Sequence, residues 1–522
     1  MSARLRRVLI AALCGVLLWQ VWQHVARGAR AAPVASLTPA PPDELQLGRL
    51  QLKPCTIGQR RTGVPTLAAY CTRFTVPEDW GAPRGRQIDL KVAVLGASSA
   101  APEPDPVVFL DGGPGGAASE DFPGIAPAFE LLRRRHRVLL LDQRGTGGSN
   151  PLGCQDSEQG PSGRAATVAP AAEATRRDLS TQSERLRACV LRLAAHAAPQ
   201  FYTTSVAVRD LEALRAALGG PRLNLLGISY GTRVAQQYAH RYPQAVRTVV
   251  LDSAVPNDLA LGAEQARNLE DALRALAGRC RAVADCARAY GDPYALLQRV
   301  QARLRAQPQT LTLRDPYTFA PAERQVDAAQ LAQLVRFYAY NPLTAALIPY
   351  VLREAEAGRY APLLGQTQLV VGELADHLDN AMALSVICTE DVDLLRARPQ
   401  DADTLLGNDL LENLQSACRI WPHGGRPADF HEPLRSDLPV LLLAGENDPV
   451  TPPRYALAIA RALSHARVLT LRGQGHGLVG VGCVPRLLEE FVRRADAAAL
   501  DVQCLQQLGS TPAFLDANGA GP

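Results

Sequence analysis

The chain is 522 residues long, 47% hydrophobic and 20% charged, with a formal net charge of +4. This composition is typical of a soluble globular protein, and the length indicates one large domain with an insertion, or two domains. The basic residues are scattered arginines, with Lys53 and Lys91 as the only lysines, a pattern unlike a nucleic-acid-binding surface. No nucleic-acid partner is therefore expected.

Residues 1–31 have the pattern of a secretory signal. Three arginines precede an apolar run from residue 8 to about residue 22, and Ala29-Arg30-Ala31 fits a small-x-small cleavage site. Gln20 and Gln23 interrupt the run before it reaches about 20 residues, which favours a cleaved signal over the alternative, an uncleaved membrane anchor. We expect a secreted or periplasmic protein that meets a membrane only if this segment stays attached.

Ten cysteines follow the signal segment, and an even number in an exported chain indicates disulfides. No C-x-x-C occurs, so a zinc site has no support. Neither a metal nor a cofactor is expected. Sequence does not determine connectivity, but pairing neighbours in order closes short loops. The hypothesis joins Cys55 to Cys71, Cys154 to Cys189, Cys280 to Cys286, Cys388 to Cys418 and Cys483 to Cys504. The alternative is that these cysteines are buried free thiols.

After a proline-rich linker (33–42), short apolar runs bounded by turn residues predict strands. They lie at 88–95, 107–110, 138–141, 223–226, 249–251, 440–443 and 468–471. Helical patterns such as 205–218 and 232–241 fall between them. Strands that alternate with helices, several of them continuously apolar, predict a mostly parallel sheet covered on both faces.

This alternation stops between about residues 261 and 430, where segments such as 263–277 and 328–337 predict helices, and it resumes at 438. A helical insertion that splits a sheet domain and covers one edge of the sheet as a cap explains the pattern. The expected organisation is a signal at 1–31, a first core part at 32–260, the cap at 261–430 and a C-terminal core part at 431–522.

Residues 223–232, LNLLGISYGT, combine a buried strand, a G-x-S-x-G turn and the start of a helix. The two glycines are needed because side chains there would collide in the strained turn that exposes the serine. This arrangement is typical of the nucleophile of an α/β-hydrolase fold. Ser229 is therefore the predicted nucleophile.

A serine hydroxyl needs a base that is itself oriented by an acid, and this fold orders them serine, acid, histidine along the chain. His476 lies in a glycine-rich loop directly after a predicted strand, so it is the predicted base. Asp448 follows the strand 440–443 and is the predicted acid. Glu446 is the local alternative and Asp252 the distant one.

Acyl transfer also requires donors for the developing oxyanion. The backbone N–H of Tyr230, directly after the nucleophile, is the first. The second is expected from the loop 111–116, DGGPGG, which follows the strand 107–110. Gly113 is chosen, with Gly112 as the alternative.

The chain resembles the proline iminopeptidase and tripeptidyl aminopeptidase family of serine exopeptidases. The resemblance rests on GGPGG at 112–116, DQRGTGGS at 142–149, the Ser229 turn, and the segments around Asp448 and His476. One departure is Asp111, where many members of the iminopeptidase branch have histidine. The size, the export signal and the pair Cys483 and Cys504 are more similar to the secreted tripeptidyl aminopeptidase branch.

The resemblance implies an exported serine aminopeptidase whose partner is a peptide with a free N-terminus. A free ammonium calls for a carboxylate at a fixed distance from the nucleophile. Glu390, in a segment similar to the family's acidic cap segment, is the candidate, the alternative being a solvated carboxylate. The rival functions are a secreted esterase with the same triad and a noncatalytic binding protein on a hydrolase scaffold.

Overall fold

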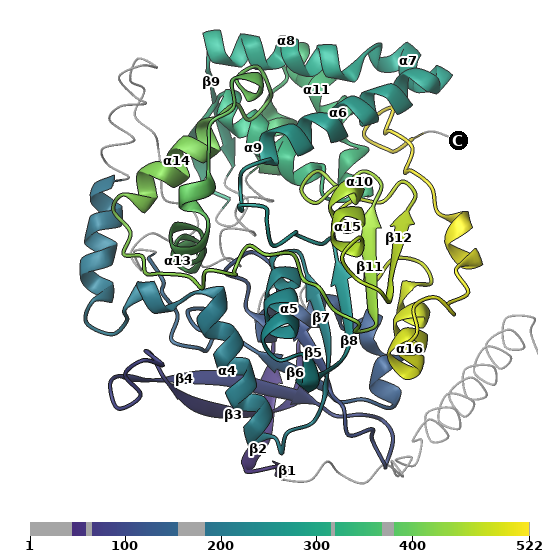
Figure 1. Ribbon diagram of the computed structural model, residues 1–522. Helices are drawn as coiled ribbons and strands as arrows, with labels where there is room; N and C mark the ends of the chain where they lie inside the picture. Colours follow the sequence, from purple (N-terminus) through teal and green to yellow (C-terminus); the bar gives the residue numbers. More distant parts are fainter. Residues whose placement is uncertain (1–43, 59–64, 155–182, 315–318, 368–379, 521–522) are drawn as a thin grey trace, which may run out of the picture. The chain divides into compact units, whose positions relative to one another are not determined.

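The structure is a computed structural model that describes residues 44–58, 65–154, 183–314, 319–367 and 380–520 (Figure 1). The predicted signal segment 1–31, its cleavage motif and the proline-rich linker lie outside the described residues. Within the described ranges, no helix has the length and apolar character needed to cross a bilayer.

A mixed sheet lies at the centre of the described chain, with the strand order β1-β2-β3-β4-β6-β5-β7-β8-β11-β12. Neighbouring strands from β6 to β12 are parallel, whereas β1 to β4 pair antiparallel and β4 pairs antiparallel with β6. All the predicted strands are present, and β1, β2 and β3 were not predicted. The bounds are β1 Leu45–Leu47, β2 Leu50–Ile57, β3 Leu67–Pro77, β4 Gln87–Leu95, β5 Val107–Leu110, β6 Val138–Leu141, β7 Leu223–Ile228, β8 Val246–Asp252, β11 Val440–Gly445 and β12 Ala466–Leu471.

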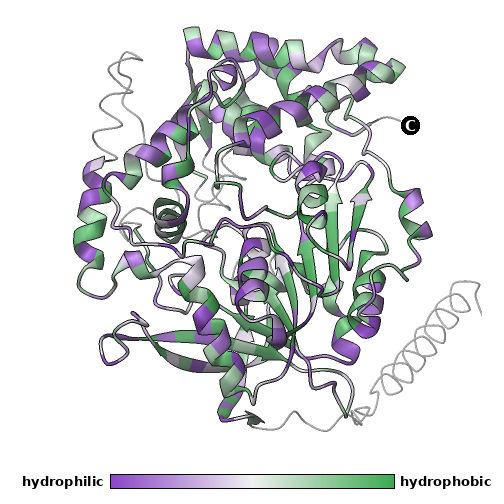
Figure 2. Cartoon of the chain, viewed as in Figure 1, coloured by the Kyte–Doolittle hydropathy of each residue, from purple (hydrophilic) through white to green (hydrophobic). Residues whose placement is uncertain are grey.

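Helices cover both faces of the parallel part of the sheet. One face packs against α4 (Thr204–Ala217), α5 (Tyr230–Arg241) and α15 (Pro453–Ala460), and the other against α2 (Ala118–Ile125) and α16 (Val484–Arg494). Strands β5 and β11 are buried along their whole length, which explains their continuously apolar sequences. In Figure 2 the strands of this region are mostly hydrophobic, while the helices show one hydrophobic and one hydrophilic side.

The described residues between 261 and 430, here called the cap, have a hydrophobic core of their own. In Figure 1 most of the cap helices gather at the top of the view, on the side toward which β11 and β12 point. A short hairpin, β9 (Gln309–Arg314) with β10 (Pro321–Val326), interrupts the helices and was not predicted. The cap helices are α6 Gln265–Ala282, α7 Ala284–Tyr290, α8 Pro293–Ala306, α9 Ala328–Tyr338, α10 Pro342–Ala345, α11 Ile348–Glu356, α13 Asn380–Glu390 and α14 Asp409–Cys418.

Side-chain caps explain where several helices begin. Asp292 accepts hydrogen bonds from the first amides of α8, and Asp327 forms a capping box with Gln330 at the start of α9. Thr203 caps α4 through the amide of Val206. Short 3-10 helices lie at Ala126–Phe129, Leu132–Arg134, Pro199–Phe201, Pro243–Ala245, Val392–Leu394, Pro399–Asp401 and Gln503–Gln507.

Ten cysteines in the described residues form five disulfides, and each pair is the one hypothesised from the sequence. Cys55–Cys71 joins β2 to β3, Cys280–Cys286 joins α6 to α7, and Cys388–Cys418 joins α13 to α14. The alternative of buried free thiols is wrong for all ten.

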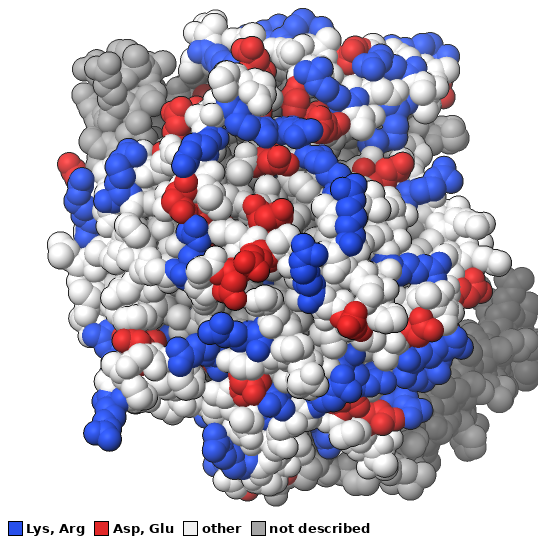
Figure 3. Space-filling view, in the orientation of Figure 1, with Lys and Arg blue, Asp and Glu red and all other residues white. Residues whose placement is uncertain are grey.

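Charged side chains of both signs are present on the face of the molecule shown in Figure 3. On the face shown in Figure 3, basic and acidic side chains lie interspersed among larger uncharged areas. Several form ion pairs one helical turn apart, such as Arg267–Asp271 at 3.9 Å and Arg493–Glu489 at 3.2 Å. Exposed pairs of this kind each contribute only a few tenths of a kcal/mol, about 0.2–0.5.

Candidate active site

The predicted site residues follow neighbouring parallel strands at the carboxyl edge of the sheet. Ser229 comes directly after β7, Asp252 ends β8, Asp448 follows β11 and His476 follows β12. Since β7, β8, β11 and β12 are consecutive in the sheet, these side chains from distant parts of the chain are brought to one edge. This edge is where open α/β sheets bind their ligands.

Ser229 occupies a strained turn between β7 and α5. Its φ of 55° and ψ of −122° are uncommon for a residue with a side chain and cost on the order of 1–3 kcal/mol. A Cβ on Gly231 would lie 2.0 Å from the Leu110 carbonyl oxygen, and one on Gly227 would lie 2.3 Å from the Gly231 oxygen. Both glycines are therefore required by close backbone contacts, as the G-x-S-x-G pattern predicts.

His476 and Asp448 are joined by a hydrogen bond. Nδ1 of His476 lies 2.8 Å from Oδ2 of Asp448, whose side chain is completely buried. The Asp448 carboxylate also accepts the backbone N–H groups of Val450 and Thr451, each at 2.8 Å, and the Thr451 hydroxyl at 2.7 Å. The same hydroxyl lies 3.3 Å from His476 Nδ1. The carboxylate is therefore fixed in the orientation that binds the imidazole.

The charges of this pair reinforce each other. Burial raises the pKa of Asp448, but the positive charge and hydrogen bond of His476 outweigh it and leave the pKa below its usual value. Burial lowers the pKa of His476, and the Asp448 carboxylate more than offsets this, so the net shift is upward. The pair favours an ionised aspartate and a readily protonated histidine.

The two carboxylates considered as alternatives to Asp448 form hydrogen bonds with backbone N–H groups and not with the His476 ring. Glu446 Oε2 accepts the backbone N–H of Gly473 at 2.7 Å. Asp252 accepts backbone N–H groups of the loop after His476, and its carboxylate is not among the hydrogen-bond partners of the imidazole. Of the three carboxylates considered from the sequence, Asp448 is the one bound to His476.

The segments that carry Ser229 and His476 both form hydrogen bonds with the end of β8. The loop after β12 lies against the end of β11, where a Cβ on Gly445 would be 1.8 Å from the Gly475 oxygen. Gly477 N–H donates to Ser253 Oγ at 2.9 Å, and Ser229 N–H donates to the carbonyl of Asp252 at 2.9 Å. Within the described residues there is no hydrogen bond between Ser229 Oγ and the His476 ring. The structure thus brings both to the same edge without joining them directly.

The loop 111–116 lies beside the nucleophile. A Cβ on Gly112 would be 3.3 Å from Ser229 Cβ. The Gly112 N–H donates to Asp111 Oδ1 at 2.7 Å, whereas the N–H groups of Gly113 and Tyr230 have no acceptor in the described part of the chain. Gly113 has a φ of 111°, which favours glycine. Of the two candidate loop donors, only that of Gly112 is already occupied.

A cap residue contacts the histidine loop directly. The carbonyl of Tyr340, just after α9, accepts the His476 N–H at 2.7 Å, and the two rings meet edge to face with centroids 5.2 Å apart. A Cβ on Gly475 would lie 2.1 Å from the same carbonyl. The loop that carries His476 is therefore packed against the cap, which the sequence did not reveal.

Glu390, at the end of α13, is fully buried. Its Oε2 accepts the Thr204 hydroxyl at 2.6 Å and its Oε1 the Ser205 N–H at 3.2 Å. Thr204 Oγ1 also lies 2.7 Å from the hydroxyl of Tyr230, the residue after the nucleophile. Burial raises the pKa of Glu390 to about 7. The alternative of a solvated carboxylate is therefore wrong.

Beside Glu390 lies a buried ion pair. Asp391 Oδ2 accepts from Arg233 Nη1 at 2.8 Å, and neither side chain is exposed. The cluster of Glu390, Asp391 and Arg233 holds two carboxyl groups and one guanidinium. His431 Nε2 lies 3.7 Å from Asp391 Oδ1. Unless Glu390 is protonated or His431 is charged, the cluster has an excess of negative charge away from water.

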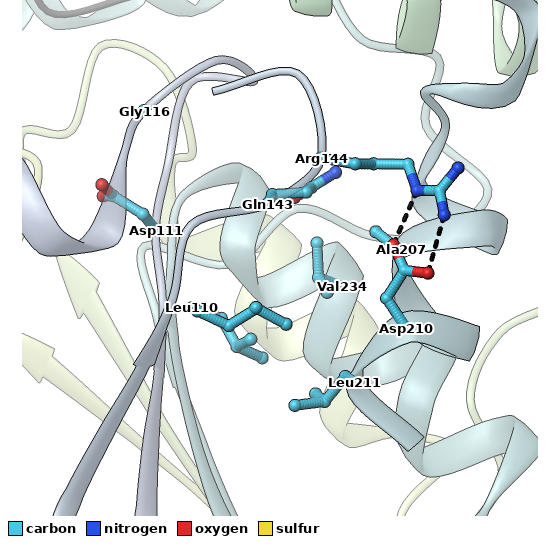
Figure 4. A pocket seen from close by; sticks show the side chains of 10 residues that line it. Leu110, Asp111, Gly116, Gln143, Arg144, Ala207, Asp210, Leu211 and Val234 are labelled. Carbon is cyan, nitrogen blue, oxygen red and sulfur yellow. Dashed lines mark hydrogen bonds and ion pairs between the residues drawn. The ribbon is translucent and has the colours of Figure 1, made fainter. Parts of the chain in front are cut away.

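A pocket beneath the loop 111–116 is shown in Figure 4, lined in part by Leu110, Asp111 and Gln143. Arg144 and Asp210 border it, joined by two hydrogen bonds of 2.6 and 2.7 Å, and both are buried. Gln143 donates to the Tyr230 hydroxyl at 3.0 Å. Arg144, in the DQRGTGGS segment, thus fixes its loop to Asp210 of α4.

A family model described as alpha/beta hydrolase fold matches residues 105–482. The chain belongs to the α/β-hydrolase family. The match includes Ser229, Asp448 and His476, and together with the sheet order it confirms the predicted fold class.

Known relatives of this α/β-hydrolase include peptidases. The tripeptidyl aminopeptidase of Streptomyces coelicolor is 28% identical over 458 residues, which cover 83% of this chain and 82% of the relative. The serine protease Hip1 of Mycobacterium bovis is 30% identical over 250 residues, 47% of each chain. A solved structure of proline iminopeptidase from Mycobacterium smegmatis aligns with 82% of this chain and 100% of that chain, with 17% identity and a TM-score of 0.37. The sequence similarities confirm the predicted family resemblance.

The α/β-hydrolase site also contains residues that sequence reasoning missed. Thr451, Tyr340 and Ser253 contact the histidine or its loop. Asp252, considered from the sequence only as an alternative acid, binds the backbone of that loop. Thr451 could have been found, because a hydroxyl residue three positions after an aspartate often forms a local turn with it. In the described ranges, no group of three or more His, Cys, Asp or Glu residues is arranged to bind a metal ion.

Proposed function

We propose that this α/β-hydrolase is an exported serine aminopeptidase that releases short N-terminal units from peptides through an acyl-enzyme. The units are tripeptides or a single residue such as proline. The observation that carries the proposal is the hydrogen bond between His476 and Asp448 at the sheet edge that also bears the strained Ser229. Similarity to a tripeptidyl aminopeptidase over most of the chain supports a peptide bond as the target.

In the proposed reaction, Ser229 Oγ attacks the carbonyl carbon of a peptide bond near the substrate N-terminus while His476 takes its proton. The C–N bond then breaks, and His476 passes the proton to the leaving amine. Water attacks the resulting ester, losing a proton to His476, which returns it to Ser229 Oγ as the acid product leaves. Asp448 stabilises the imidazolium that forms in both steps.

The separation of Ser229 Oγ from His476 in the described state is compatible with this role. Catalytic hydrogen bonds are often long in ligand-free sites and tighten in the substrate complex. The contact between Tyr340 and the His476 backbone supports a coupling between cap position and this distance. Substrate that enters beneath the cap would then shorten it.

Two backbone N–H groups are suited to the oxyanion. Tyr230 is the first residue of α5, so its N–H has no partner within the helix, and the helix terminus favours negative charge. Gly113 supplies the second, since the Gly112 N–H is occupied by Asp111. We propose Gly113 and Tyr230 as the oxyanion donors.

Glu390 is proposed as the anchor for the substrate ammonium. Its cluster holds two buried carboxyl groups, Glu390 and Asp391, with the Arg233 guanidinium paired to Asp391. His431 Nε2 lies 3.7 Å from Asp391 Oδ1, and a substrate ammonium would add positive charge beside Glu390. An ammonium beside the carboxyl also favours its ionised form. Hydrogen bonds link the Glu390 carboxyl to Thr204 and Thr204 to Tyr230, the residue after Ser229. They hold the carboxyl at a fixed distance from the nucleophile, which recognition of a chain terminus requires.

The direct test of the proposed function is product analysis by mass spectrometry. A short peptide with a free N-terminus is compared with its acetylated form, and a Ser229→Ala protein is the control for contaminating peptidases. We expect N-terminal fragments from the free peptide alone. Cleavage of both peptides alike, with faster hydrolysis of simple esters, would instead support the esterase. No hydrolysis of any substrate would support the noncatalytic binding protein.

The proposed role of Glu390 has its own test. Glu390→Gln should lower peptide hydrolysis while hydrolysis of a small ester without an amine survives. Glu270→Gln is the matched control, because Glu270 is a buried carboxyl group on α6 that pairs with Arg274. Equal loss of both activities in Glu390→Gln, or an equal effect in Glu270→Gln, would defeat the assignment.

Export is proposed from the N-terminal pattern and supported by the five disulfides, which persist in oxidising compartments. N-terminal sequencing of the protein recovered from culture medium or periplasm should start after residue 31. Recovery in the membrane fraction with the segment intact would instead indicate an anchored protein.

A further inference from the structure

Asp252 and Ser253, at the end of β8, contact every segment that carries the proposed triad. The Asp252 carbonyl accepts the Ser229 N–H at 2.9 Å. Ser253 N–H donates to the carbonyl of Leu443 in β11, the strand that leads to Asp448, also at 2.9 Å. Ser253 Oγ accepts the Gly477 N–H at 2.9 Å. This dipeptide is therefore a junction between the nucleophile turn, the acid strand and the histidine loop.

The Asp252 side chain completes the junction. Its Oδ2 accepts the N–H groups of Leu478 and Val479 at 2.6 and 2.9 Å, and its Oδ1 accepts the Ser253 hydroxyl at 3.0 Å. Both Asp252 and Ser253 are completely buried. The residues after His476 are thus bound by a carboxylate that cannot exchange its partners for water.

Ser253 has a φ of 56°, in the left-handed region that residues with side chains seldom adopt. Glycine would fit this backbone without penalty, yet the position holds a hydroxyl that both donates to Asp252 and accepts from Gly477. A strained serine beside an active-site edge indicates that its hydrogen bonds are needed there.

The charge of Asp252 also acts on the histidine. Burial raises the pKa of Asp252 to about 6, against the lowering effects of its backbone donors, the Ser253 hydroxyl and the His476 charge. At neutral pH the group is therefore ionised, and its negative charge raises the pKa of His476 from the side of β8, while Asp448 does so from Nδ1. His476 thus lies in the field of two buried carboxylates.

We infer that Asp252 and Ser253 are positioning residues of the hydrolytic site, which fix the His476 loop against the Ser229 turn through their hydrogen bonds to both segments. This inference rests on the proposed function, because it assigns how that site is held together. Asp448 orients the ring, and Asp252 sets the position of the loop that carries it. Neither Asp252 nor Ser253 touches the reacting atoms.

The test compares Asp252→Asn and Ser253→Ala with a matched control, Asp105→Asn. The amide side chain introduced by Asp252→Asn keeps the shape, and its oxygen can still accept from the two backbone N–H groups. The variant thus removes the charge and the acceptor of the Ser253 hydroxyl, and Ser253→Ala reports the loss of that hydroxyl alone. Asp105 is also a buried, hydrogen-bonded carboxyl, but it lies before β5, at the opposite edge of the sheet. Titration with a fluorophosphonate counts the active sites in each preparation, so that misfolded protein does not affect the kinetic constants.

Per titrated site, Asp252→Asn should lower kcat by about 10- to 100-fold with little change in KM, the size of effect that a misplaced catalytic group produces. The acid limb of its pH profile should move to lower pH, because a negative charge near His476 is lost. Ser253→Ala should lower kcat by about 10-fold without that shift, because it removes a hydrogen bond and no charge. Asp105→Asn should reduce thermal stability and leave both kcat and the acid limb within about twofold of wild type.

Wild-type kcat and an unmoved acid limb in Asp252→Asn would overturn the inference, as would a kcat loss in Asp105→Asn of the same size. If Asp252→Asn does not fold, Ser253→Ala decides: wild-type kcat there would overturn the inference. A wild-type protein that the fluorophosphonate does not label would instead refute the proposed function itself.

Discussion

The hydroxyl of Thr451 binds the carboxylate of Asp448 at 2.7 Å, on the same oxygen that faces the His476 ring. Thr451→Val keeps the shape of the side chain and removes this donor. A hydrogen bond to a charged group contributes about 1.5–3 kcal/mol, so kcat should fall by about 10-fold or more with KM nearly unchanged. Steady-state kinetics on a peptide amide check this, and a wild-type kcat would show that the hydroxyl has no part in the reaction.

The pH dependence of activity should follow the protonation of His476. The base must be neutral to take the Ser229 proton, and the Asp448 carboxylate raises the pKa of His476 above its ordinary value of 6.5. Activity is therefore low under acidic conditions, and kcat/KM should rise with pH through a midpoint above 6.5. An ascending limb centred below 6.5 would contradict the arrangement.

Asp448→Asn should move this midpoint down and lower kcat by about 10⁴-fold, as in other serine hydrolases that lose the acid. The shift follows because the variant removes the negative charge that favours the imidazolium. Measurement of kcat/KM across the acidic and neutral range on both proteins checks both effects. Similar profiles for the two proteins would indicate that a different carboxylate pairs with His476.

Stability should fall as the pH rises through the titration of Glu390. Its pKa is raised by burial from 4.5 in the unfolded chain to about 7 when folded. Between these values the folded state keeps a proton that the unfolded chain has lost, so this contribution to stability is complete below pH 4.5 and disappears as the pH approaches 7. Glu390→Gln should show a smaller decline in melting temperature over this range, and an unchanged decline would place the titration on another group.

The ion pair between Arg233 and Asp391 should be needed for the fold. Arg233→Met leaves the buried Asp391 carboxylate without its guanidinium partner, and breaking a buried pair in this way typically destabilises a protein by about 3–5 kcal/mol. The double variant Arg233→Met with Asp391→Asn removes both charges and should recover part of this loss. Urea denaturation at neutral pH compares the three proteins, and a single variant as stable as wild type would show that the pair is dispensable.

Much of this site could be predicted from the sequence because its signals are local. Strands such as β5 and β11 are buried on both faces and hence continuously apolar. The Ser229 turn and the His476 loop carry glycines whose positions are dictated by backbone contacts. The cysteine pairing could be predicted because each disulfide joins neighbouring cysteines in the sequence, as in Cys55–Cys71 and Cys280–Cys286.

The features that were missed depend on distant partners or on weak local patterns. The burial of Glu390 comes from α4, and the cap contact to His476 comes from Tyr340. The hairpin β9–β10 alternates between half-buried and exposed residues over most of its length and lies in a helix-rich region. Strand β3 mixes polar and apolar residues on both faces. Its sequence therefore shows neither the two-residue period of a strand nor the 3.6-residue period of a helix clearly.

The central claim, that Ser229 is a nucleophile activated by His476 and Asp448, is tested most directly by covalent labelling. Wild-type protein, Ser229→Ala and His476→Ala are treated with a fluorophosphonate, and the modified peptide is identified by mass spectrometry. We predict one adduct, on Ser229, which is absent from Ser229→Ala and forms far more slowly in His476→Ala. An unlabelled wild-type protein, or an adduct on a different serine at the same rate in all three proteins, would contradict the claim.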